Sequence, residues 1–255
     1  MGLTRMELYL NHERPLTENE LGEFKSYIKR TIMNEPAQYI VGHQEFWSLD
    51  FKVTSDVLIP RADTETLVEA LLDDIRENES AKIDILEIGT GSGAISVSVA
   101  HALKDERKNS ITAVDISESA LGIAKENAAT NAVGDAITFI HSDMFKSIDS
   151  DMRFDYIVSN PPYIAHEFYE ALDKKVKDFE PKLALYADDD GMQYYAEIFL
   201  KGCEYLKENG KIFIEIDYRK KKELAILASA NSYSVVGCYK DISGHDRVLE
   251  LIKRG

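Results

Sequence analysis

The sequence lacks several features that would each place it in a distinct class of proteins. No apolar run approaches the ~20 residues of a membrane-spanning helix. The charged N-terminal stretch around Arg5, Glu7 and Glu13 contains no hydrophobic core of a signal peptide. Its two cysteines, Cys203 and Cys238, are isolated and form no metal-type cluster. These absences predict a cytoplasmic protein with reduced thiols, no membrane partner and no metal site.

Positive charge is also scarce. The 255 residues include 30 Lys and Arg against 45 Asp and Glu, which gives a net charge of −15. Binding to nucleic acid draws much of its affinity from the neutralisation of phosphates, so this balance argues against a nucleic-acid substrate. Two small basic clusters, at 174–177 and 219–222, are interpreted as solvated helix faces.

The N-terminal stretch predicts helices. Thr17 and Glu20 form a capping box ahead of apolar residues at helical spacing, and Pro36 ends this helix. A shorter helix is expected at residues 5–10. Helices of this size bury little surface by themselves, so we expect them to pack either on the main domain or on residues upstream of them.

A linker follows the helices. Residues 39–53 are short, aromatic and β-branched segments separated by turn signals, which predicts extended structure and a hairpin. A third helix is predicted from about 64 to 78, with Asp63 as its N-cap. The resulting division is a helical segment at 1–36, a hairpin and connecting helix at 37–78, and a main domain at 79–255.

The main domain alternates strands and helices without internal repeats. Strands are expected at 83–88, 111–115, 136–141, 154–158, 211–216, 233–239 and 247–252. Because helical patterns separate most of these strands, the fold class is α/β with a largely parallel, doubly wound sheet.

A glycine-rich loop joins the first of these strands to its helix. It consists of Gly89, Thr90, Gly91, Ser92 and Gly93. Such a loop lets a nucleotide approach the backbone closely. With Ala94 it also fits the dinucleotide pattern, so by itself it does not separate NAD from S-adenosylmethionine, and an ordinary tight turn is the structural alternative.

Two further strand ends carry candidate cofactor ligands. Asp115 ends the second strand, where its carboxylate can accept hydrogen bonds from two ribose hydroxyls. After the third strand, Asp143 can accept from an adenine amino group while Met144 packs on the ring. Taken alone, Asp143 is nearly as well explained as a helix or turn cap.

The fourth strand leads into Asn160, Pro161, Pro162 and Tyr163. The prolines force extended backbone and remove N–H donors, which predicts a stiff loop at the strand's carboxyl end. The Asn160 side chain and the Pro161 carbonyl can then accept hydrogen bonds from a planar –NH2 group, and Tyr163 offers a face for stacking. This arrangement orients an amide nitrogen for methyl transfer and stabilises charge developing on it, whereas nicotinamide chemistry has no use for it.

The sequence resembles the release-factor glutamine methyltransferases (PrmC/HemK-type). The resemblance runs from about Leu8 to the C-terminus. It is carried by the stretches 35–42, 45–47, 58–65, 89–93, 159–163 and 179–181. The Asn-Pro-Pro-Tyr stretch alone also occurs in adenine methyltransferases, so the Ile-Pro-Arg-x-Asp-Thr-Glu stretch at 59–65 adds the specificity.

The resemblance implies a Rossmann-like, seven-stranded methyltransferase sheet whose last strand is antiparallel. It implies S-adenosylmethionine as donor and, as acceptor, the glutamine of the Gly-Gly-Gln motif in class-1 peptide-chain release factors. By matched position, residues 89–93, Asp115, Met144 and Asn160 would contact the cofactor, and residues 160–163 the glutamine. Pro60 and Arg61 would border the pocket. On this basis Asn160, Pro161 and Tyr163 are the predicted catalytic residues, and a monomer acting on a protein partner is expected.

Two departures from the family pattern stand out. Only about 35 residues precede Glu35, so we expect a shortened N-terminal helical domain, and a reduced grip on the partner. The fifth strand leads into a charged loop at 217–220 where the family usually has a glycine-containing turn.

Three other functions remain open at this point. A nucleic-acid adenine or cytosine amino-methyltransferase would use the same –NH2 acceptors and stack the extruded base on Tyr163. A cofactor-binding module without catalysis and a dehydrogenase are the other two.

Overall fold

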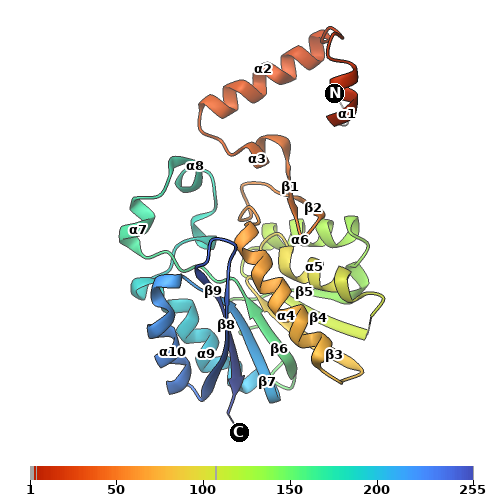
Figure 1. Cartoon of the computed structure of the whole chain (residues 1–255). Coiled ribbons are helices and arrows are strands. Elements are labelled where there is room, and N and C mark those ends of the chain that lie inside the picture. Colours follow the sequence, from red (N-terminus) through yellow and green to blue (C-terminus); the bar gives the residue numbers. More distant parts are fainter. Residues whose placement is uncertain (1–2, 4, 107, 255) are drawn as a thin grey trace.

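The computed structural model describes residues 3, 5–106 and 108–254. Its centre is a seven-stranded sheet (Figure 1) in the order β5-β4-β3-β6-β7-β9-β8. The strands are β3 (Lys82–Ile88), β4 (Lys108–Asp115), β5 (Ile137–His141), β6 (Phe154–Ser159), β7 (Leu206–Glu215), β8 (Tyr233–Lys240) and β9 (Asp246–Lys253). Strands β3 to β7 pair in parallel, whereas β9 is antiparallel to both of its neighbours. The predicted fold class, including the antiparallel last strand, is confirmed.

Each face of the sheet is buried under helices. In β3, Ile83 and Ile85 join a core with α4 (Glu65–Glu77) and α5 (Ala94–Leu103). Leu86 and Ile88 join a second core with α9 (Gln193–Tyr205) and α10 (Lys221–Ala230). Successive side chains of a strand point to opposite faces, so an almost continuous apolar run serves both cores. Figure 1 shows α9 and α10 together beside the β7–β9 part of the sheet.

The helix α6 (Glu118–Thr130) anchors the linker to the main domain. Its Ala120 and Ile123 share a small core with Tyr39, Val53 and Ile59. The hairpin of β1 (His43–Phe46) and β2 (Leu49–Lys52) lies beside it, because the Asn127 side chain both accepts from and donates to the Lys52 backbone.

The N-terminal helices α1 (Arg5–Leu10) and α2 (Glu18–Ile32) stand apart from the sheet (Figure 1). The predicted capping box is confirmed, since the Thr17 hydroxyl accepts from the Glu20 N–H while the Glu20 carboxylate accepts from the Thr17 N–H. No residue of α2 is buried, and its apolar residues Leu21, Phe24 and Ile28 are 40 to 53% exposed. Among the described residues, this helix buries none against the main domain, and its Arg30 side chain donates to the Tyr39 and Ile40 carbonyls. Packing on residues upstream stays a prediction. No helix in the described part of the chain is long and apolar enough to cross a membrane.

Two local predictions are wrong. Extended structure was expected at Tyr39, but Ala37–Val41 forms the helix α3, because this short helix buries the Tyr39 ring and lets its hydroxyl donate to the Val57 carbonyl at 2.6 Å. Asp63 is not a helix cap. It lies inside a 3-10 helix and pairs with Arg247 at 3.1 Å, and α4 begins without a side-chain cap.

The long segment between β6 and α9 closes on itself near both of its ends. It contains α7 (His166–Glu170) and α8 (Lys174–Lys177). At its start, Ile164 forms an isolated bridge with Tyr186. At its end, Gly191 has a positive φ of 82° and packs so tightly against the Tyr163 carbonyl that a Cβ atom there would collide with it.

The change Gly191→Ala should therefore destabilise the protein by more than left-handed backbone strain alone. Gly244→Ala is the matched control, because Gly244 has a similar φ of 84° and a Cβ there would meet no atom within 4 Å. Backbone strain should cost each variant about 1–2 kcal/mol, and the collision should cost Gly191→Ala at least about 1 kcal/mol more. Urea unfolding measures both, and equal losses would contradict the tight packing.

Candidate functional site

A cavity of about 180 Å³ lies at the carboxyl ends of β3, β4 and β6. This is where ligands bind in open, parallel α/β sheets. Twelve of the fourteen predicted site residues line it: Pro60, Arg61, Gly89, Thr90, Gly91, Ser92, Asp115, Asp143, Met144, Asn160, Pro161 and Pro162. Gly93 and Tyr163 are not among the lining residues.

The glycine loop turns sharply under the cavity. Gly89, Gly91 and Gly93 all have positive φ, between 54° and 80°, which glycine adopts without steric cost. A Cβ on Gly89 or Gly91 would meet no atom within 4 Å, whereas one on Gly93 would lie 3.2 Å from the Ala124 Cβ. The first two glycines thus leave the loop backbone open to a ligand, and Gly93 serves the packing of α5 on α6.

Asp115 fastens the glycine loop to the end of β4. One carboxylate oxygen accepts from the Gly91 N–H at 2.8 Å, and the other accepts from the Ser117 N–H at 2.9 Å. Burial raises the pKa of Asp115, and these backbone donors oppose that shift. Each oxygen keeps further acceptor capacity, so the carboxylate can also receive ribose hydroxyls.

Glu87 is a cavity residue that the sequence reasoning missed. It is 1% exposed and accepts hydrogen bonds from the Thr90 hydroxyl at 2.7 Å and the Ser96 N–H at 3.2 Å. Burial raises the pKa of its carboxyl to about 7. A signal was present in the sequence, because a carboxylate stands within the apolar end of the strand, two residues before the glycine loop.

The end of β5 presents Asp143 and Met144 to the cavity. Met144 has a positive φ of 52°, an uncommon conformation for a side-chain-bearing residue, and the Ser142 hydroxyl stabilises the turn by donating to the Met144 carbonyl. Asp143 pairs with the exposed Lys146 at 2.5 Å. The adenine contacts predicted for this pair stay predictions.

Asn160 has a defined orientation at the end of β6. Its Nδ2 donates to the Thr64 hydroxyl oxygen at 3.1 Å. In the part of the chain that the structure describes, Oδ1 accepts no hydrogen bond. The neighbouring Pro161 is buried and also lines the cavity. Asn160 can therefore act as an acceptor towards a ligand, as its predicted role requires.

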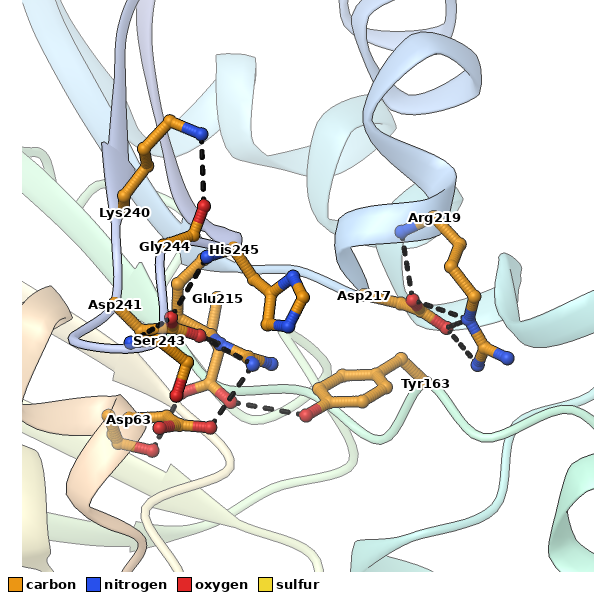
Figure 2. Close-up of polar contacts among 12 residues, drawn as sticks. Asp63, Tyr163, Glu215, Asp217, Arg219, Lys240, Asp241, Ser243, Gly244 and His245 are labelled. Carbon is orange, nitrogen blue, oxygen red and sulfur yellow. Dashed lines mark hydrogen bonds and ion pairs between the residues drawn. The ribbon is translucent and has the colours of Figure 1, made fainter.

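Tyr163 points away from the predicted stacking position. Its ring packs against the core shared with α9 and α10, and its hydroxyl donates to Glu215 at 3.2 Å (Figure 2). Burial, together with the neighbouring Glu215 charge, raises the pKa of this hydroxyl far above its usual value. The role of Tyr163 in gripping a substrate stays a prediction.

Arg61 forms one wall of the cavity together with a distant segment. Its guanidinium pairs at 2.5 Å with the buried Glu180, whose other oxygen accepts from the Ile59 N–H at 3.3 Å. Pro181 and Leu183 continue this wall. The Glu180 carboxylate thus joins the stretch at 59–61 to its own segment, about 120 residues later in the sequence.

The charged loop after β7 does not line the cavity. Asp217 binds Arg219 through both its carboxylate oxygens (Figure 2), and Arg219 also lies over the Phe168 ring at 4.0 Å. Tyr218 stacks on His245. These contacts tie the loop to its surroundings rather than to the cavity.

Comparison with solved structures shows which fold the chain has. A methyltransferase from Pyrococcus furiosus has a TM-score of 0.57 at 17% identity, covering 90% of this chain and 98% of that one. The Thermus thermophilus 16S rRNA methyltransferase RsmC has a TM-score of 0.56 at 18% identity, covering 83% and 50%. At these identities the similarity shows the fold, which is that of a Rossmann-like methyltransferase.

Comparison with known sequences identifies the family to which the chain belongs. Residues 61–178 match the methyltransferase small domain, and residues 1–42 match the PrmC N-terminal domain. A release factor glutamine methyltransferase of Fusobacterium nucleatum is 43% identical over 250 residues, which cover 98% of this chain and 69% of that protein. The Lactococcus lactis protein of the same name is 43% identical over 238 residues, covering 92% and 84%. The chain belongs to the release factor glutamine methyltransferase family.

The raised pKa of Glu87 predicts a specific dependence of stability on pH. Between its ordinary value of 4.5 and about 7, the folded protein holds a proton that the unfolded chain has released. The contribution of this group to the free energy of unfolding therefore falls as pH rises through that window and is constant above it. Glu87→Gln cannot titrate, so its stability relative to the unchanged protein should rise by up to about 3 kcal/mol between pH 5 and pH 8.

Urea unfolding at both pH values measures this difference. The exposed Glu208→Gln is the control and should follow the unchanged protein at both. Parallel behaviour of Glu87→Gln and the unchanged protein would rule out a buried, proton-holding Glu87.

Proposed function

We propose that this chain transfers a methyl group from S-adenosylmethionine to the side-chain amide nitrogen of the glutamine in the Gly-Gly-Gln motif of class-1 peptide-chain release factors. The observation that carries the proposal is the fixed Asn160 amide, whose free oxygen belongs to a cavity floored by the glycine loop. Family membership supplies the acceptor, because relatives at 43% identity bear the name release factor glutamine methyltransferase.

The cavity residues fit the proposed donor. The open backbone at Gly89 and Gly91 would accept a ligand at close range, Asp115 would hold the ribose, and Met144 would pack on the adenine. When bound, S-adenosylmethionine supplies a methyl group on a positively charged sulfur. The half-buried carboxylate of Asp115 suits a cationic ligand better than an anionic one.

The acceptor nitrogen would be held by two oxygens. Asn160 Oδ1 and the Pro161 carbonyl would each accept one N–H of the glutamine amide, which fixes the nitrogen's direction. An amide nitrogen is a poor nucleophile, because its lone pair is delocalised into the carbonyl. As the nitrogen–carbon bond forms, the bond from that carbon to the sulfonium sulfur would break, and the donor would leave as a neutral thioether. The positive charge then develops on the nitrogen, where the two oxygens stabilise it until one of its protons is released to solvent.

A protein substrate also agrees with the electrostatics. The net charge of −15 disfavours a phosphate backbone, and we propose a cytoplasmic monomer that acts on protein and binds no nucleic acid or membrane. Pro60 and Arg61, the latter held by Glu180, would border the entering glutamine.

Labelling of a release factor tests the acceptor. With labelled S-adenosylmethionine, the purified chain should methylate a class-1 release factor, and replacing the Gly-Gly-Gln glutamine by alanine should remove the label. Label that persists on the alanine variant would refute the proposal. Duplex and single-stranded DNA and RNA, offered in parallel, should remain unlabelled, and their labelling would favour the nucleic-acid alternative.

Removal of the Asn160 amide tests the acceptor pair. Asn160→Ala should lower the turnover number about 100-fold, the scale of losing one oriented polar group in a water-excluded site. Thermal unfolding should show that the fold is kept. A near-normal turnover number in this variant would exclude a role for Asn160 in holding the glutamine.

A further inference from the structure

A chain of hydrogen bonds leads from β7 to Asn160. Thr64 is 4% exposed, and its hydroxyl donates to Glu215 Oε2 at 2.6 Å while its oxygen accepts from Asn160 Nδ2 at 3.1 Å. A threonine hydroxyl has a single hydrogen. Because that hydrogen is committed to Glu215, only the oxygen of Thr64 remains for Asn160, and it can receive only the –NH2 end of the amide.

Glu215 sets the direction of this chain. It is 2% exposed, at the end of β7, and its Oε1 accepts from the Tyr163 hydroxyl at 3.2 Å (Figure 2). An ionised carboxylate only accepts hydrogen bonds. The hydroxyls of Thr64 and Tyr163 must therefore both donate to Glu215. Thr64 then has no hydrogen left to donate to Asn160.

Charged groups around Glu215 support its ionised form. Burial raises the pKa of Glu215 to about 7, while the Arg247 guanidinium on β9 and the two hydroxyl donors act against that shift. Arg247 is itself held by Asp63 at 3.1 Å and Asp241 at 2.8 Å. Asp63, from the 3-10 helix before α4, raises the pKa of Glu215 further. At pH 8 the carboxylate form predominates.

We propose that Thr64 and Glu215 are positioning residues that fix the orientation of the Asn160 amide, so that Oδ1 and not Nδ2 faces the substrate. This inference rests on the proposed function. In the opposite orientation Asn160 would present –NH2 to the –NH2 of a glutamine, and neither group could accept from the other. The catalytic acceptor is thus selected by a carboxylate that does not line the cavity.

The inference distinguishes three substitutions. Thr64→Val keeps the shape but has no oxygen, so the Asn160 amide loses its orienting partner. Thr64→Ser keeps the hydroxyl and should keep the orientation. Glu215→Gln brings an –NH2 group that can donate to Thr64, which frees the threonine hydrogen to donate to Asn160 Oδ1 and favours the wrong orientation.

Kinetics of the full chain at pH 8, with a class-1 release factor as substrate, test this. Thr64→Val and Glu215→Gln should each lower the turnover number at least about tenfold, with the dissociation constant for S-adenosylmethionine unchanged within about twofold. Thr64→Ser should stay within about threefold of the unchanged protein. A merely structural role would instead lower stability and leave the turnover number of the folded fraction unchanged, which would overturn the inference. If Thr64→Val fails to fold, the turnover number and the dissociation constant of Glu215→Gln test the inference in the same way.

A second readout does not depend on activity. The side-chain amide resonances of Asn160, identified by their loss in Asn160→Ala, should move towards solvent-exposed values in Thr64→Val and stay in place in Thr64→Ser. If the unchanged protein fails to methylate release factors but these resonances behave as expected, the proposed function falls and the orienting role stands. Resonances that are unmoved in Thr64→Val would overturn the orienting role alone.

Discussion

The parallel pairing of β3 with β6 is the constraint on which the site depends. Ile88 is the register partner of Ser159, and the Ser159 hydroxyl also donates to the Ile88 carbonyl at 2.8 Å. Both strands therefore end at the same level, so the glycine loop and Asn160 emerge side by side. Strands that ended at different levels would separate the cofactor loop from the proposed acceptor pair, whatever residues each carried.

Much of this arrangement could be predicted from the sequence, because it depends on local patterns. The apolar runs predicted the strands, and the loops that follow parallel strands all lie at one edge of the sheet. Twelve predicted site residues consequently surround one cavity. The capping box at Thr17 was predictable for the same reason, since it needs only residues three positions apart.

Contacts between distant residues could not be predicted in this way. Asp63 has the right residue type for a helix cap, but Arg247, 184 positions later, provides a charge partner. Thr64 and Glu180 likewise have partners more than 100 positions away. No periodicity or spacing reports such pairs, and Tyr163 lies outside the cavity because Glu215 and the adjacent core hold its ring.

The closed loop between β6 and α9 has a consequence for how members of such a family can diverge. Its start and its end are both fastened near Tyr163, through the Ile164–Tyr186 bridge and the close approach of Gly191. The part of this segment that contains α7 and α8 lies between these two attachments and before Glu180, Pro181 and Leu183, which belong to the cavity wall. Insertions and deletions there would reshape the rim without disturbing the chemistry, so selection can act on partner choice and on catalysis separately.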